Sequence, residues 1–319
     1  MRLGLAGLGL HGGRYAAHLL AGDVPGASLG AISRANHLEG ALFALQNNAV
    51  YVADPRELAT LPDLDGVVVC LPPDLHPDVA IACLEAGRPV LVEKPMARNG
   101  TEAARVVAAA ERTGTPIMIA HTLRFDPLIV ALRREVPTLG ALRMLAVSQR
   151  FEPTSRAWID TPGRGGVILN TGVHAFDLLR FLTGLEIVSV QADAARVTTS
   201  HTEDQFAAIV RLAPGGILAA VDNARTTDSR SGRIEIVGER AQLRADHIHR
   251  EIVRLEGRTV CDLGPIEAAP TVALAMRAFV GALRGNAPMP VTAVDGAAAV
   301  GAVDAAYASI PTRNGAVFP

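Results

Sequence analysis

The chain has 319 residues, of which 49% are hydrophobic, and its formal net charge at pH 7 is -2. This length predicts two domains with ample buried core, and the near balance of charge excludes the basic surface that nucleic acids and anionic membranes require. The three cysteines lack disulfide or metal-knuckle spacing and no apolar stretch reaches the length of a membrane span, so we expect a cytoplasmic protein without nucleic-acid or membrane partners.

The first expected element is a buried strand over residues 3–8, followed by a G-x-G-x-x-G pattern at residues 7–12 and a helix to about residue 20. Glycines there permit a tight turn and let a pyrophosphate approach the helix amides, which predicts a dinucleotide site. A plain glycine turn is the alternative. The candidate cofactor contacts in this turn are Gly7, Gly9, Leu10, His11 and Gly12.

A second expected strand, residues 28–32, ends in Ser33 and Arg34. Proteins that bind NAD in this way carry an acidic residue about twenty positions past the glycines, where it holds the ribose hydroxyls, and this chain has none there. A hydroxyl followed by a guanidinium suits a 2′-phosphate, so NADP is the preferred cofactor and NAD remains possible. The alternative is an ordinary exposed arginine at a strand end.

The next buried strand begins at residue 65 and ends in a proline turn. Leu71 and Pro72 are expected to form a rigid lip for the adenosine ribose or the nicotinamide, and His76 just beyond them is a further candidate cofactor contact. A helix from Pro77 then ends at Gly87. Such alternation of unpatterned apolar strands with helices predicts a parallel, doubly wound sheet.

Lys94 is the single lysine of the chain, and it follows a buried strand over residues 89–92. Every other basic side chain is arginine, so a need for positive charge alone does not explain a lysine here. Lysine is a compact ammonium whose pKa falls readily on burial, which suits proton transfer, and strand ends are where open α/β sheets bind ligands. Pro95 makes the peptide between the two residues a candidate for a cis bond. A surface lysine retained by chance is the alternative.

After His121 the pattern changes. A helix over residues 126–135 and a strand over 142–149 lead to a loop with Trp158 and the glycine-rich residues 162–166. Residues 167–182 are then expected to form one amphipathic helix. Asn170 and His174 stand four residues apart and therefore share a face of it, which favours a site role over a purely structural histidine.

Successive strands with short turns are expected from residue 186 to 260, followed by closing helices over 271–283 and 295–308. They predict an open antiparallel sheet with one face packed on helices and the other free, a common route to a homodimer or homotetramer. His247 and His249 lack a third ligand in the sequence, so no metal site is expected.

Five blocks occur in one order, and together they resemble the glucose-fructose oxidoreductase, inositol dehydrogenase and MocA family (Gfo/Idh/MocA) over essentially the whole chain. The resemblance implies an α/β protein with a Rossmann domain, residues 1–121, and a C-terminal α/β domain, residues 122–319, whose open sheet is mostly antiparallel. The blocks are the glycine pattern at 7–12, Pro72-Pro73-x-x-His76, Glu93-Lys94-Pro95, Arg124-Phe125-Asp126-Pro127, and Gly165-Gly166-x-x-x-Asn170-x-Gly172-x-His174-x-x-Asp177.

The family resemblance also implies an activity: hydride transfer between nicotinamide and a secondary alcohol of a sugar, inositol or related polyol. Lys94 and His174 would act on the hydroxyl proton, with Glu93 on the cofactor side helping to place the lysine. Arg124, Trp158 and Asn170 are candidate substrate contacts together with His174. Many members carry aspartate at the position of Asn170, and asparagine cannot supply the negative charge that raises the basicity of a histidine.

Two other interpretations remain open. One is a non-catalytic NADP-binding sensor of the same fold, which Asn170 makes more plausible but which the retention of Lys94 and His174 disfavours. The other is a reductase of imines or double bonds, or an enzyme that oxidises dihydrodiols. Residues 150–164 would choose among substrates.

Overall fold

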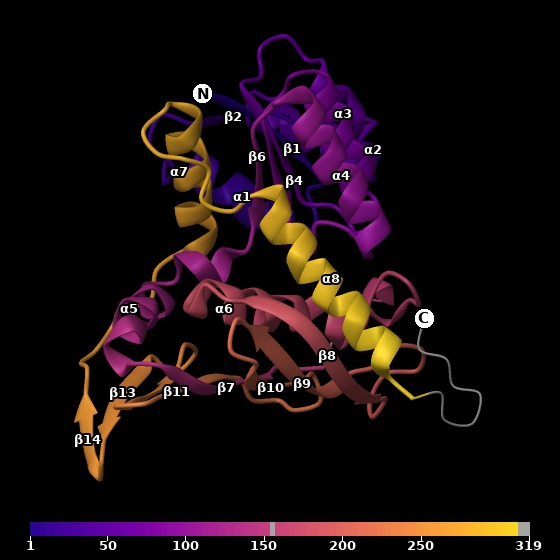
Figure 1. Ribbon diagram of the computed structural model, residues 1–319. Helices are drawn as coiled ribbons and strands as arrows, with labels where there is room; N and C mark the ends of the chain where they lie inside the picture. Colours follow the sequence, from indigo (N-terminus) through magenta and orange to yellow (C-terminus); the bar gives the residue numbers. More distant parts are fainter. Residues whose placement is uncertain (154–156, 312–319) are drawn as a thin grey trace. The chain divides into compact units, whose positions relative to one another are not determined.

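The computed structural model describes residues 1–153 and 157–311 (Figure 1). The chain forms two compact units, each with its own sheet and core. The first unit comprises Met1–Thr122 and Pro270–Ala297, and the second comprises Leu123–Ala269 and Ala298–Pro319.

The sheet of the first unit has six strands in the order β3-β2-β1-β4-β5-β6, all parallel. This is the doubly wound order predicted from the alternating pattern. The four central strands are built almost entirely from buried Val, Leu, Ile, Ala and Gly, as strands covered on both faces require. The strands are β1 (Arg2–Ala6), β2 (Ser28–Ser33), β3 (Val50–Val52), β4 (Gly66–Val69), β5 (Val90–Glu93) and β6 (Ile117–Ala120).

Helices connect these strands, and their ends follow local chemistry. Asn36 and Asn99 cap α2 and α4 by accepting a hydrogen bond from the main-chain N–H three residues later, and Gly114 ends α4 in the left-handed conformation. The elements are α1 (Leu10–Leu20), α2 (His37–Gln46), the 3-10 helix η1 (Pro55–Ala59), α3 (His76–Glu85) and α4 (Gly100–Thr113).

A late segment of the chain returns to the first unit. Helix α7 (Thr271–Leu283) buries Met276 and Phe279 completely and contacts α1 and β6. The Phe279 ring lies against Gly66 of β4. The segment comes after the strands of the second unit in sequence, so the local sequence pattern does not predict that it packs in the core of the first unit.

The sheet of the second unit has eight strands in the order β14-β13-β12-β11-β7-β10-β9-β8. Only the β7–β10 pair is parallel, so the expectation of an open, mostly antiparallel sheet is confirmed. The strands are β7 (Leu142–Arg150), β8 (Glu186–Ala195), β9 (Gln205–Ala213), β10 (Ile217–Ala224), β11 (Ser231–Gly238), β12 (Gln242–Asp246), β13 (Glu251–Glu256) and β14 (Thr259–Asp262).

One face of this sheet packs on helices α5 (Pro127–Glu135), α6 (Val173–Thr183) and the later turns of α8 (Ala293–Ser309), which bury a single apolar core (Figure 1). Strand β9 alternates regularly, with Phe206, Ala208, Val210 and Leu212 facing that core. Its opposite side exposes Ile209, and on the same face β10 exposes Leu218 and β7 exposes Met144. Short 3-10 helices complete the unit: η2 (Thr122–Phe125), η3 (Val136–Leu139) and η4 (Ala157–Asp160).

The structure differs from the expected helix over residues 167–182 in one respect. Residues Ile168–Gly172 form a π-helical turn, η5, and the α-helix begins only at Val173. Such turns occur mostly as single bulges within helices, frequently at functional sites. Strands β3 and β14 were not predicted. Within residues 1–153 and 157–311, no helix has the length and apolar character needed to cross a membrane.

Candidate active site

The candidate residues of the first unit lie where its parallel strands end. The glycine turn follows β1, Ser33 and Arg34 close β2, Leu71 and Pro72 follow β4, and Lys94 follows β5. The carboxyl ends of parallel strands share one edge of a sheet, where open α/β sheets bind ligands. Four separate chain segments are thus brought to the same edge.

The glycine turn fits a dinucleotide. A Cβ on Gly12 would lie 2.0 Å from the carbonyl oxygen of Gly7, so glycine is required for the helix to start this close to the strand. No atom lies within 4 Å of a Cβ built on Gly9. Gly9 is the N-cap of α1 and supplies no side-chain cap, so first-turn amides face outward with the positive end of the helix dipole. Leu10 and His11 begin that turn.

Glu93 lies at the centre of a hydrogen-bond network that joins this helix to Lys94. Its Oε1 accepts hydrogen bonds from the Tyr15 hydroxyl at 2.5 Å and from His11 Nε2 at 2.8 Å, and its Oε2 accepts from the Lys94 main-chain N–H at 3.0 Å. Burial would raise the pKa of Glu93, but His11, Lys94 and Tyr15 together lower it to about 2. The carboxylate is therefore ionised, and both of its oxygens accept hydrogen bonds. Sequence reasoning missed Tyr15, which is one helical turn beyond His11.

His76 is enclosed rather than open to a ligand. Its side chain is buried, with Nδ1 2.8 Å from the Pro95 carbonyl oxygen and Nε2 2.7 Å from that of Leu71. Burial lowers the pKa of His76, although the two carbonyl oxygens favour the protonated ring. The imidazole thus ties the turn after β4 to the turn after β5. The Lys94-Pro95 peptide is cis, as the sequence suggested.

Ser33 is buried, and its carbonyl oxygen accepts the Gly7 N–H at 3.0 Å. The Arg34 guanidinium forms an ion pair with Glu39 in the first turn of α2. The Arg34 carbonyl oxygen accepts a hydrogen bond from Tyr51, whose hydroxyl also meets His37 Nδ1. Glu39 was not predicted from the sequence as a partner for this arginine.

In the second unit, Asn170 and His174 are both half-buried, one in the π-helical turn and the other at the start of α6. Arg124 binds Asp177 through a bidentate ion pair in which its Nη2 lies 2.6 Å from Oδ1. Its guanidinium also lies 5.2 Å from the centre of the Phe181 ring. Arg124 therefore anchors η2 to α6.

Trp158 is held on the short helix η4, whose last residue, Asp160, is tied to the loop before β9. The Asp160 carboxylate accepts the main-chain N–H groups of Ser200, His201 and Thr202 at 2.9–3.0 Å. Burial would raise the pKa of Asp160, but these three donors lower it to about 2. No sequence motif pointed to Asp160.

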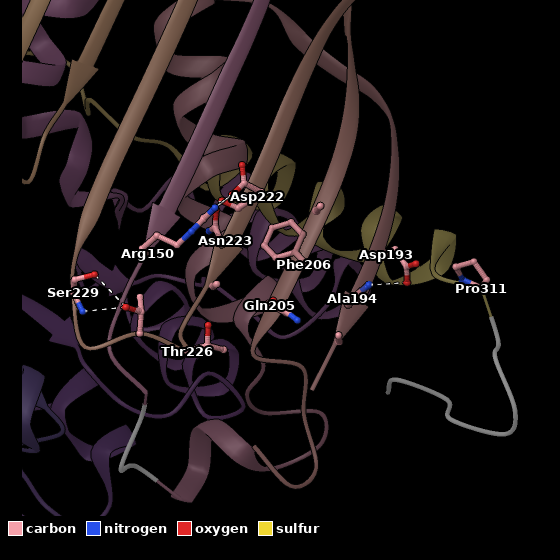
Figure 2. A pocket seen from close by; sticks show the side chains of 14 residues that line it. Arg150, Asp193, Ala194, Gln205, Phe206, Asp222, Asn223, Thr226, Ser229 and Pro311 are labelled. Atoms are coloured by element: carbon pink, nitrogen blue, oxygen red, sulfur yellow. Dashed lines mark hydrogen bonds and ion pairs between the residues drawn. The ribbon is translucent and has the colours of Figure 1, made fainter. Parts of the chain in front are cut away.

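A cavity of about 870 Å³ opens on the second unit, and Figure 2 shows Arg150 and Asp222 paired within it. Its lining comes from the ends of β7 to β10, and it includes none of Trp158, Asn170 and His174. In the part of the chain that the structure describes, no cluster of three or more metal-ligating side chains is present. We therefore assign no catalytic role to this cavity.

Comparison with known proteins agrees with both units. A family profile described as "Oxidoreductase family, NAD-binding Rossmann fold" matches residues 1–121, and a "GFO/IDH/MocA C-terminal domain" profile matches residues 137–244. The chain is similar to an inositol 2-dehydrogenase of Rhizobium meliloti, with 26% identity over 79% of this chain and 80% of the relative. It is 30% identical to the rhizopine catabolism protein MocA of Rhizobium meliloti, over 76% and 75% of the two chains.

The fold is also that of a solved structure, the aldose-aldose oxidoreductase of Caulobacter crescentus in complex with glycerol. The TM-score is 0.87 at 20% identity, and 97% of each chain is covered. The chain therefore belongs to the Gfo/Idh/MocA family of oxidoreductases, and its first unit carries an NAD(P)-binding Rossmann domain.

Proposed function

We propose that this oxidoreductase acts on a CH–OH group, transferring a hydride between a secondary alcohol of a sugar, inositol or related polyol, or its keto form, and nicotinamide. The observation that supports it most is Lys94, the single lysine of the chain, held at the carboxyl end of β5. The similarity to inositol 2-dehydrogenases supports the substrate class.

The bound nicotinamide would supply the hydride chemistry, and the residues of the chain would bind it and manage the proton. The first-turn amides of α1 would hold the pyrophosphate, and Leu71 and Pro72 would border the cofactor. Lys94 and His174 would take up and release the hydroxyl proton of the substrate. Glu93, whose Oε2 accepts the Lys94 main-chain N–H, would fix the main chain at Lys94.

On the substrate side, Asn170 would hydrogen-bond a hydroxyl group and Trp158 would offer an apolar face. Asn170 carries no charge, so His174 would lack a carboxylate partner at this position. The bidentate pair with Asp177 leads us to propose that Arg124 acts mainly by fixing α6. Direct contact between Arg124 and substrate remains a prediction.

We propose NADP as the preferred cofactor. No acidic residue follows β2 directly, and Arg34 stands where a 2′-phosphate would need a cation. Glu39 now satisfies that guanidinium, so a 2′-phosphate would compete with a carboxylate for it. NAD binding remains possible on the same turn.

We also propose that the protein assembles as a homodimer or homotetramer through the open face of the second sheet. That face exposes Met144, Ile209 and Leu218 beside small alanines and the ion pair between Arg150 and Asp222. An apolar centre with charged groups around it is the composition of a protein interface.

The test is nicotinamide absorbance, with NADP and NAD each offered against sugars, inositols and diols. Turnover with one class names the substrate. If the protein binds the cofactor tightly but turns over no compound of the panel in either direction, the result favours a non-catalytic NADP-binding sensor, the alternative that Asn170 suggests. Turnover only on imines or dihydrodiols would favour the other enzymatic class.

A further inference from the structure

Three chain segments are joined beside the candidate substrate residues, two of them close together in sequence and the third much later in the chain. They are η4 with Trp158, the turn at Gly165 and Gly166 before η5, and residues 199–204. The Gly166 N–H donates to the Ile159 carbonyl oxygen at 2.9 Å, and the Thr202 hydroxyl donates to the same oxygen at 3.0 Å. The two substrate-side segments therefore depend on the third for their placement.

Glu203 is the centre of this junction. Its Oε1 accepts the main-chain N–H of Ile168, the first residue of η5, at 2.9 Å and the hydroxyl of Tyr307 from α8 at 2.8 Å. Its own carbonyl oxygen accepts the Val167 N–H at 2.9 Å. The residue is buried, and a Cβ on Gly166 would lie 2.3 Å and 2.5 Å from its two carboxylate oxygens, so a side chain there would collide with them. The proposed proton transfer makes no use of this carboxyl group.

We propose that Glu203 is a positioning residue for the reaction: its carboxylate, braced by Tyr307, fixes the start of the segment that presents Asn170 and His174. Helix starts leave main-chain N–H groups without partners, and a buried acceptor aimed at one of them determines where the first turn sits. This inference rests on the proposed function only because it assumes that Asn170 and His174 act on the substrate. The placement of the segment is a property of the protein alone.

The carboxyl group of Glu203 also makes this placement sensitive to pH. Burial raises its pKa to about 7, partly offset by the donors from Ile168 and Tyr307. The neighbouring Asp204 adds to the rise, Tyr307 is the titratable group facing it from α8, and the Ile168 main-chain N–H faces it from η5. Ionised carboxylates accept hydrogen bonds more strongly than neutral acids, so while Glu203 stays buried its hydrogen bonds to Ile168 and Tyr307 are stronger above pH 7 than below it.

The test compares wild type with Glu203→Gln and Tyr307→Phe, using two readouts. The first is kcat/KM from pH 5.5 to 9 on the substrate that the absorbance panel identifies. Glutamine keeps the size of the side chain and cannot ionise, so we expect about a tenfold loss at pH 8.5, little loss at pH 6, and KM for the nicotinamide cofactor unchanged. Tyr307→Phe should give a smaller loss of the same sign.

The second readout needs no substrate. Trp158 is the only tryptophan in the sequence, and the next residue, Ile159, accepts a hydrogen bond from the Gly166 N–H. The emission of Trp158 therefore reports on the junction. Wild type should show an emission change centred near pH 7 that Glu203→Gln abolishes. Glu251→Gln, an exposed carboxylate of the same unit, and His201→Gln should both leave that change intact.

Each outcome decides the proposal. An emission change that survives in Glu203→Gln, or a kcat/KM profile parallel to that of wild type at every pH, overturns it. Failure of every substrate in the panel would overturn the proposed function instead, and the emission titration would still decide whether Glu203 holds the segment.

Discussion

At the scale of single residues, buried carboxylates in this protein differ by what donates to them. Glu93 receives three donors and a positive neighbour, and its pKa falls to about 2. Glu203 is buried with the neutral donors Ile168 and Tyr307 and with Asp204 beside it, and its pKa rises to about 7. The first stays ionised across the physiological range, whereas the second changes charge within it.

The raised pKa of Glu203 predicts a pH-dependent stability. A carboxyl group whose folded pKa lies above its unfolded value stabilises the fold fully below the unfolded value, and that contribution is lost as pH rises through about 7. Glutamine does not ionise, so Glu203→Gln removes this pH-dependent loss of stability. The free energy of unfolding of the variant, relative to wild type, should therefore increase between pH 5 and pH 8, by on the order of 3 kcal/mol at most.

Urea unfolding at the two pH values measures this difference, and Glu251→Gln is the control. A constant offset between Glu203→Gln and wild type is expected from the added amide N–H groups. A relative stability that does not change with pH would show that Glu203 keeps an ordinary pKa.

At the scale of elements, the first turn of α2 is predicted to set the cofactor preference. Arg34→Ala should weaken NADP binding by about tenfold or more and NAD binding far less, because only NADP offers a phosphate to the guanidinium. Glu39→Gln should strengthen NADP binding, since it removes the carboxylate that pairs with Arg34. Titration calorimetry with both cofactors measures these changes. Equal effects on NAD and NADP would contradict the assignment.

The glycine-rich turn before η5 is predicted to tolerate no side chain. A Cβ on Gly165 would lie 1.8 Å from the Ile159 carbonyl oxygen, so Gly165→Ala must displace η4 or the turn itself. We expect a loss of unfolding free energy on the order of 3 kcal/mol. Gly301→Ala in α8 is the control, because no atom lies within 4 Å of its Cβ and alanine favours helix. Equal stability of the two variants would contradict the tight contact.

Sequence patterns predicted the sheet types and most element bounds, because apolar runs and alternation are local. The glycine turn and the Lys94 strand end were found in the same way. The structure alone revealed Glu203, Asp160 and Tyr15. Each acts through a contact with a chain segment far away in sequence, as when Glu203 meets Tyr307, 104 residues later. No local pattern marks such a partner.

At the scale of the whole molecule, the open face of the second sheet is predicted to be the subunit interface. Ile209→Glu, in the middle of β9, should convert the oligomer into monomers by placing a charge in an apolar contact. Leu42→Glu on α2 of the first unit, a residue exposed to a similar degree, should leave assembly unchanged. Analytical ultracentrifugation distinguishes the species. Monomeric wild type, or an Ile209→Glu oligomer, would contradict this interface.

The central claim is that the molecule is a dehydrogenase whose single lysine handles the substrate proton. The most direct measurement is turnover and cofactor affinity of Lys94→Met beside wild type, on the best substrate of the panel. The account predicts a loss of kcat between about a hundredfold and ten-thousandfold, with NADP affinity changed by less than about threefold. Wild-type turnover in the variant, or an equal loss of cofactor binding and kcat, would contradict it.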